Sequence, residues 1–227
     1  MARPVFVLGL QRSGTTWIAN LLAGSGVVAA VTAQEHRGVH ESVFFSHFAT
    51  AFGLFEDAAA RAAFTTAFAA SDYFLLTGLP RRVLDEAVER ARDHAEVFAR
   101  VMDAFAAREG CTHWLEKSPH HTPLAEDLAR RFPEARFVCI TRSSTSLVAS
   151  RLAAYGRTPP SGPRRAADIL RGALVNALYT RRLERFAAGC DRALLLRYDA
   201  FAADPAAGRR RLCAFLGLDV APEALAS

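Results

Sequence analysis

Short apolar runs recur along the chain and predict five buried strands. Each run is four to six residues long, is mostly apolar, and is bounded by polar residues, glycine or proline. The runs are Val5–Leu8, Val27–Thr32, His113–Glu116, Arg136–Thr141 and Ala193–Arg197.

Between these runs, apolar residues recur three or four positions apart, which is the spacing of an amphipathic helix. The pattern is clearest over Arg81–Arg108, with a stop signal at Gly110, and Gly217 ends the last helix. Helices are predicted over Trp17–Leu22, Glu41–Phe55, Ala58–Ala70, Arg81–Arg108, Thr122–Arg131, Thr145–Tyr155, Arg165–Ala187 and Pro205–Leu216.

Strands that alternate with helices predict an α/β fold, a parallel sheet with helices on both faces. We expect one domain over residues 1–227, with a helical insertion over 36–110 after the second strand. Ligands of such sheets bind beyond the carboxyl ends of the strands. The polar residues at or just past those ends are Arg12, Glu35, Lys117, Arg142 and Tyr198.

The stretch from Pro4 to Leu22 reads as strand, glycine-bearing turn and helix, the layout of a phosphate-binding loop. Backbone N–H groups and the helix N-terminus of such a loop hold an anion. The spacing is that of the nucleotide-triphosphatase loop, but Thr15 stands where the lysine belongs. The sequence therefore predicts a P-loop-type fold that uses a phosphate donor other than ordinary ATP. The alternative is a structural turn that merely contains glycines.

Composition adds further observations to this pattern. The net charge of +5 suits an anionic ligand and would equally suit a nucleic acid. Of the 28 basic residues only Lys117 is a lysine. With so strong a bias toward arginine, the individual arginines say little about function, whereas the single lysine says more. The four cysteines have no metal-ligand spacing, and no stretch is long enough to span a membrane. We expect a soluble cytoplasmic protein.

Two further segments invite a functional interpretation. Eight of the sixteen phenylalanines lie between Phe44 and Phe74, where they could line an apolar acceptor pocket or simply form core. The segment Gly156–Pro163 is rich in glycine and proline and is predicted to be a loop that could act as a lid.

Four motifs resemble those of the sulfotransferases that use 3′-phosphoadenosine 5′-phosphosulfate (PAPS). Val5–Trp17 is similar to the family's 5′-phosphosulfate loop, and Arg136–Ser150 to its 3′-phosphate motif, a strand that ends in arginine with a serine eight residues on. Leu196–Pro205 resembles the family's late tyrosine-acidic segment, and Arg211–Leu218 continues it. Glu116–Pro119 looks like the third-strand signature of the bacterial and tyrosylprotein branches.

The resemblance implies PAPS as the donor and adenosine 3′,5′-bisphosphate (PAP) as the product, with no metal. Two anion sites are then needed, one for the 5′-phosphosulfate and one for the 3′-phosphate. The implied donor-binding residues are Arg12, Ser13, Gly14, Thr15, Thr16 and Trp17 of the loop, with Arg142, Ser150 and Tyr198. Among them, Arg142 and Ser150 would hold the 3′-phosphate, while Trp17 would stack on adenine or serve as core.

For the chemistry, the resemblance makes Glu35 the base that takes the proton of an acceptor hydroxyl. Arg12 and Lys117 would stabilise the leaving group. Other residues that could serve as the base are His36, His40, Glu41 and His120.

Several departures separate this chain from the cytosolic branch. Arg12 replaces the loop lysine, no histidine follows Lys117-Ser118-Pro119 at the expected place, and the terminal R-K-G-x-x-G segment is missing. Two other classes of function stay open: a P-loop kinase, and a non-catalytic, arginine-rich nucleic-acid-binding module. The acceptor could be a small molecule, lipid, sugar or peptide tyrosine, and the oligomeric state is open.

Overall fold

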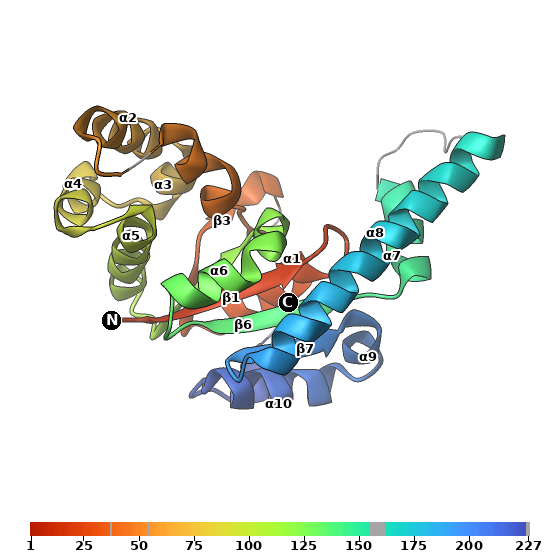
Figure 1. Ribbon diagram of the computed structural model, residues 1–227. Coiled ribbons are helices and arrows are strands. Elements are labelled where there is room, and N and C mark those ends of the chain that lie inside the picture. The colour runs from red at the N-terminus through yellow and green to blue at the C-terminus, as the bar shows by residue number, and fades with distance from the viewer. Residues whose placement is uncertain (37, 54, 155–161, 226–227) are drawn as a thin grey trace.

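The fold is α/β, as the pattern predicts (Figure 1). A computed structural model describes residues 1–36, 38–53, 55–154 and 162–225. Within these residues, a five-stranded parallel sheet has the order β2-β5-β1-β6-β7. Its strands are β1 (Arg3–Gly9), β2 (Val28–Ala30), β5 (His113–Lys117), β6 (Arg136–Thr141) and β7 (Ala193–Arg197).

The central strand β1 is buried along most of its length because the sheet is covered on both faces. Its register places Val7 opposite Lys117 of β5 and Gly9 opposite Ile140 of β6. The carboxyl ends of these three strands therefore lie side by side, and the loops that follow them share one edge of the sheet.

Two apolar clusters cover the two faces of the sheet. One contains Leu21, Phe201 and Leu212 from the helices that cover one face. The other contains Phe98, Leu128 and Leu183 from the helices that cover the opposite face. Alternation along the strands places successive buried apolar residues in opposite clusters, and helices on both faces are thus confirmed.

The α-helices in the described part of the chain lie close to their predicted places. They are α1 (Thr15–Ala23), α2 (Ala58–Ala69), α3 (Asp72–Thr77), α4 (Arg81–Arg90), α5 (His94–Arg108), α6 (Ala125–Arg131), α7 (Ser144–Ala154), α8 (Gly162–Gly189), α9 (Tyr198–Ala203) and α10 (Pro205–Leu216). The helices α2–α5 form a lobe at the left of Figure 1, while α8 extends to the upper right. None of the described helices is both long and apolar enough to cross a membrane.

The prediction of one long helix over Arg81–Arg108 is wrong. The chain breaks between α4 and α5, where Ala91 is extended and Asp93 caps the new helix by accepting the N–H of Glu96 at 2.8 Å. A capping aspartate followed three residues later by glutamate is a known start signal, and it outweighs the continuous apolar spacing.

The second strand is also shorter than predicted. Only Val28–Ala30 joins the sheet, and the chain then forms a small antiparallel ladder of β3 (Thr32–Ala33) and β4 (Gly38–Val39). The short helix η1 (Gln34–His36) connects the two strands of the ladder.

The segment predicted as a helix over Glu41–Phe55 is irregular. It contains a π-helical turn, η2 (Phe44–Phe48), and a 3₁₀ turn, η3 (Ala49–Phe52). A 3₁₀ stretch, η4 (Pro119–Leu124), likewise takes the start of the helix predicted at Thr122. The predicted loop Gly156–Pro163 lies mostly outside the described residues, and α8 begins at Gly162.

The phenylalanines of the insertion form core. The rings of Phe44, Phe64 and Phe68 are almost fully buried and pack against one another, with Phe44 4.7 Å from Phe98 of α5 between ring centroids. None of the eight phenylalanines from Phe44 to Phe74 lines either of the two pockets that are described next. The pattern of aromatic residues here reflects packing of the lobe.

Candidate active site

The loop between β1 and α1 folds tightly at the edge of the sheet. Arg12 and Gly14 both have left-handed backbones, with φ of 72° and 100°, and Ser13 N–H bonds to Leu10 O at 3.0 Å. The first hydrogen bond within α1 runs from Ile18 N–H to Gly14 O. The preceding amides therefore lie at an open helix N-terminus, where an anion binds well.

Ser13 supports the loop from inside. Its side chain is buried, and its hydroxyl donates to Leu10 O at 2.7 Å. The hydroxyl and the backbone N–H of Ser13 are thus both used within the turn, and neither is available to a phosphate. Thr122 holds the other end of the loop, because its hydroxyl accepts Gly9 N–H at 2.9 Å and donates to Gly9 O at 3.1 Å.

Arg142 reaches from the end of β6 to this loop. Its Nη1 donates to Arg12 O at 3.0 Å, and its guanidinium carbon lies 4.3 Å from the centroid of the Tyr198 ring. The Nε of Arg142 is buried and has no hydrogen-bond partner among the described residues. A buried guanidinium N–H without a partner is costly, so this donor is suited to an anion.

The loop and Arg142 line one pocket of about 330 Å³, which we call the phosphate-loop pocket. Arg12 contributes a further link across it, since its Nε donates to Ser150 Oγ at 3.2 Å. The lining residues are Arg12, Gly14, Thr15, Thr16, Trp17, Arg142, Ser150 and Tyr198. With the exception of Ser13, the residues expected to bind the donor therefore meet at this pocket.

Aromatic side chains form one wall of the phosphate-loop pocket. Trp17 meets Tyr198 edge to face at 5.6 Å and Phe201 at 5.1 Å between ring centroids. Tyr198 also lies against the loop, since a Cβ placed on Gly14 would come within 2.2 Å of its ring. Glycine at position 14 is thus required both by its backbone angle and by this contact.

Two polar residues that the sequence analysis did not single out hold the turn after β6. Asp199 accepts Ser143 N–H at 2.9 Å, and Asn176 of α8 donates to Arg142 O at 2.9 Å. Asp199 follows Tyr198 directly, so one short segment supplies both the ring beneath Arg142 and the acceptor that fixes the turn. Neither residue carries a local signal beyond its position in the late tyrosine-acidic segment or on α8.

A second pocket of about 410 Å³ adjoins the first at Thr16, and we call it the lysine pocket. Its other lining residues are Val39, His40, Glu41 and Lys117. Lys117 is 2% exposed, and its Nζ donates to Glu41 Oε1 at 2.8 Å. A buried ammonium needs such a partner, and here the partner is a carboxylate that stays in contact with solvent.

Glu35 lies apart from these pockets. It is exposed on η1, between the strands of the small ladder, and lines neither pocket. His120 is also exposed and packs against His47, while the side chain of His36 lies outside the described residues. Among the candidate bases, the structure brings Glu41 and His40 to the lysine pocket.

No group of three or more His, Cys, Asp or Glu residues is arranged to hold a metal ion within the described part of the chain. The charged groups that line the two pockets are guanidinium, ammonium and one carboxylate. These groups fit an anionic ligand better than a cation.

Comparison with known proteins gives one family and one fold. The model of the sulfotransferase family matches residues 4–222. Comparison with curated proteins gives no match.

Similar solved structures include the sulfotransferase domain of the Synechococcus PCC 7002 olefin synthase, at 17% identity and a TM-score of 0.56 over 99% of this chain and 76% of that one. A sulfotransferase domain from the curacin biosynthetic pathway has 17% identity and a TM-score of 0.58, over 99% and 77%. The sulfotransferase STF1 from Mycobacterium tuberculosis H37Rv has 19% identity and a TM-score of 0.53, over 99% and 70%. At such identities these neighbours support the fold.

Proposed function

The chain belongs to the sulfotransferase family, and we propose that it transfers a sulfuryl group from PAPS to a hydroxyl group of an acceptor. The observation that carries the proposal is the phosphate-loop pocket, in which the open N-terminus of α1 and the guanidinium of Arg142 face one space. A donor that bears a 5′-phosphosulfate and a separate 3′-phosphate needs two such anion sites.

The residues present fit this donor. Backbone amides at Gly14, Thr15 and Thr16 would hold the 5′-phosphosulfate at the helix N-terminus. The unpartnered Nε of Arg142 and the hydroxyl of Ser150 would hold the 3′-phosphate. Trp17 and Tyr198 supply an aromatic wall for adenine. The bound donor supplies an activated sulfuryl group, and the residues of the chain bind and orient the donor.

The sulfuryl group would be transferred where the two pockets meet, at Thr16. Lys117 places a buried positive charge there, suited to the charge that develops on the bridging oxygen as the sulfur–oxygen bond breaks. A carboxylate would take the acceptor's proton as the new sulfur–oxygen bond forms. We retain Glu35 as a candidate base from the sequence, and the contact with Lys117 supports Glu41 ahead of it.

Arg12 has a different position from Lys117. Its guanidinium points to Ser150 in the phosphate-loop pocket, whereas Lys117 lines the lysine pocket. The bond to Ser150 supports a role for Arg12 in donor binding. Its predicted role on the leaving group requires the side chain to turn toward Thr16.

Calorimetric titration with PAP, in the absence of metal, tests the proposal. We expect PAP to bind more tightly than ATP with magnesium, and a screen of hydroxyl acceptors with labelled donor to yield a sulfated product. Tighter binding of magnesium ATP would favour the kinase alternative. Binding of duplex DNA with a steep salt dependence, and none of PAP, would favour the nucleic-acid module.

A further inference from the structure

A buried carboxylate lies beside the lysine pocket and has no part in the donor-binding scheme. Glu116 is 1% exposed and directly precedes Lys117 on β5. Its Oε1 accepts the hydroxyls of Ser42 at 2.7 Å and Ser118 at 2.5 Å, and its Oε2 lies 2.8 Å from Nδ1 of His121. A carboxylate buried this deeply requires several donors to offset its lost hydration.

The same three partners each bind one successive backbone N–H of the segment that follows Glu41. Val43 N–H donates to Ser118 Oγ at 3.0 Å, and Phe44 N–H to Ser42 Oγ at 3.2 Å. Phe45 N–H donates to His121 Nε2 at 3.1 Å, so the ring proton of the neutral His121 is on Nδ1 and is donated to Glu116. Three amides are thus connected to one carboxylate, each through one side chain.

The backbone of this segment needs external support. Val43 has a left-handed φ of 43°, which is strained for a β-branched residue, and it begins the π-helical turn η2. Strained residues persist where their surroundings determine the conformation. Here the surroundings are the hydrogen bonds that lead to Glu116.

Two consecutive residues of β5 bind two consecutive residues of this segment. Glu116 and Lys117 point to opposite faces of the sheet, as neighbours on a strand do. Glu116 binds Ser42, and Lys117 binds Glu41. Any shift of the segment along β5 would therefore break both contacts together.

We propose that Glu116 is a positioning residue that fixes Glu41 against Lys117 in the lysine pocket. The part of this inference that concerns turnover rests on the proposed function, and the part that concerns the Glu41–Lys117 pair does not. Every polar contact that the described residues make with the Glu116 side chain is one in which its carboxylate oxygens accept, which agrees with an ionised carboxylate.

The single lysine of the chain provides a direct measurement of this pair. Protein grown with lysine labelled by ¹³C at Cε gives one lysine Cε signal, which reports on Lys117 without any assay of activity. The test variant is Glu116→Gln, whose single oxygen cannot replace both carboxylate oxygens: its NH₂ group must face either His121 Nδ1 or the hydroxyls of Ser42 and Ser118. The matched control is Asp103→Asn, which changes a carboxylate that accepts Ala2 N–H and Trp114 Nε1–H near the amino end of β5.

In Glu116→Gln we expect the Lys117 signal to move and broaden and turnover to fall 10-fold to 100-fold, while PAP affinity changes less than 3-fold. In Asp103→Asn we expect the signal and turnover to stay those of the wild type, even where melting shows lost stability. An unchanged Lys117 signal in folded Glu116→Gln overturns the proposal, as does an equal change in Asp103→Asn.

A second variant is needed where Glu116→Gln does not fold. Ser42→Ala keeps the carboxylate and removes one of its donors and the acceptor of Phe44 N–H. We expect a smaller movement of the same Lys117 signal, and no movement would overturn the proposal. Should the signal move in these variants while the wild type transfers no sulfuryl group, the positioning role stands and the proposed function fails.

Discussion

Arg142 lies over the face of Tyr198, with its guanidinium carbon 4.3 Å from the ring centroid, although 56 positions of sequence separate the two residues. The ring supports the planar cation from one side, and Arg12 O accepts one of its N–H groups. These two contacts fix the orientation of the guanidinium, so the buried Nε is held in place before a ligand binds. A single stacked arginine thus joins the end of β6 to the phosphate loop at the edge of this pocket.

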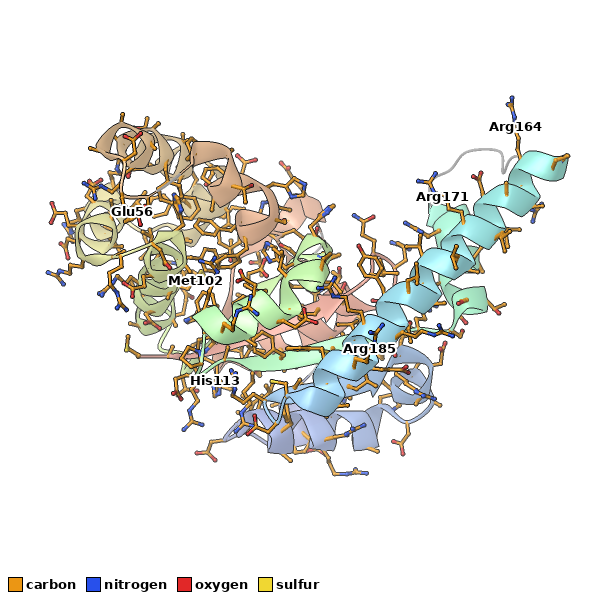
Figure 2. All side chains as sticks on the ribbon, in the orientation of Figure 1. Glu56, Met102, His113, Arg164, Arg171 and Arg185 are labelled. Carbon is orange, nitrogen blue, oxygen red and sulfur yellow. The ribbon has the colours of Figure 1, made fainter. Side chains whose placement is uncertain are left out.

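Replacement of Arg142 tests this arrangement. We expect Arg142→Ala to weaken PAP binding about 10-fold to 100-fold, because a charge-assisted hydrogen bond contributes about 1.5–3 kcal/mol. Arg142→Lys restores little, since lysine lacks the planar fork. Titration calorimetry measures both. Arg171→Ala, which removes an exposed arginine of α8 (Figure 2), is the control, and equal losses there would reduce the effect to net charge.

Replacement of Gly14, compared with replacement of Gly26, separates the effect of backbone strain from that of a steric clash with Tyr198. Gly14→Ala places a methyl group against Tyr198 at a φ of 100°, so we expect lost PAP binding and a lower free energy of unfolding. Gly26→Ala is the matched control: Gly26 also has a positive φ, of 74°, but a Cβ added there would have no atom within 4 Å. We expect it to cost about 1 kcal/mol and to leave binding intact. Chemical denaturation and calorimetry on both variants decide the matter.

Removal of the lysine tests its chemical role. We expect Lys117→Ala to leave PAP affinity largely intact and to lower turnover on the order of a hundredfold or more, the range found when a single transition-state donor is lost. The measurement is steady-state transfer with labelled donor at saturating concentrations. Unchanged turnover would remove Lys117 from the mechanism.

The two candidate bases can be separated by isosteric amides. We expect Glu41→Gln to lower turnover about 100-fold or more with little effect on PAP affinity, because its carboxylate lines the lysine pocket. Glu35→Gln, at an exposed position on η1, should change turnover less than 3-fold on the same reasoning. The opposite ranking in the same assay would return the role to Glu35.

Acid should destabilise the fold through His113 at the start of β5 (Figure 2). Burial lowers the pKa of its ring in the folded protein, and the hydrogen bond to Leu216 O only partly opposes this. The unfolded chain therefore takes up a proton near pH 6.5 that the native state binds only at lower pH. The contribution of His113 is complete above about pH 6.5 and decreases as the pH falls below it.

Thermal melting from pH 5 to 8 measures this slope. We expect His113→Gln to flatten it and His120→Gln, at an exposed position, to leave it unchanged. Some slope should remain in His113→Gln, since burial also lowers the pKa of His94. Identical slopes in the wild type and His113→Gln would contradict the assignment.

The parts of the fold that the sequence predicts best are those with one dominant local signal. The bounds of β6, β7 and α10 agree with prediction at every residue, because apolar runs or a proline start and glycine stop define them. The helix predicted over Arg81–Arg108 failed where two signals competed. Apolar spacing continues through this stretch, but the capping pair Asp93 and Glu96 starts a new helix.

For the site, motif spacing located residues that the parallel sheet brings to one edge, such as Arg142 and the loop around Gly14. It could not locate Glu41, Glu116 and His121 as a group, since the contacts that join Glu41 and its neighbours to β5 and His121 span more than 70 positions. Only the register of β5 against the segment after Glu41 creates those contacts. The same dependence on tertiary structure leaves Glu35 exposed although it follows the second predicted strand.

Thr16 borders both pockets, so ligands bound in the two pockets would both lie against one small side chain. A synthetic compound that joins an adenosine bisphosphate to an acceptor fragment would carry its tether past this side chain. Enlarging residue 16, for example to methionine, would add bulk at a position that lines both pockets.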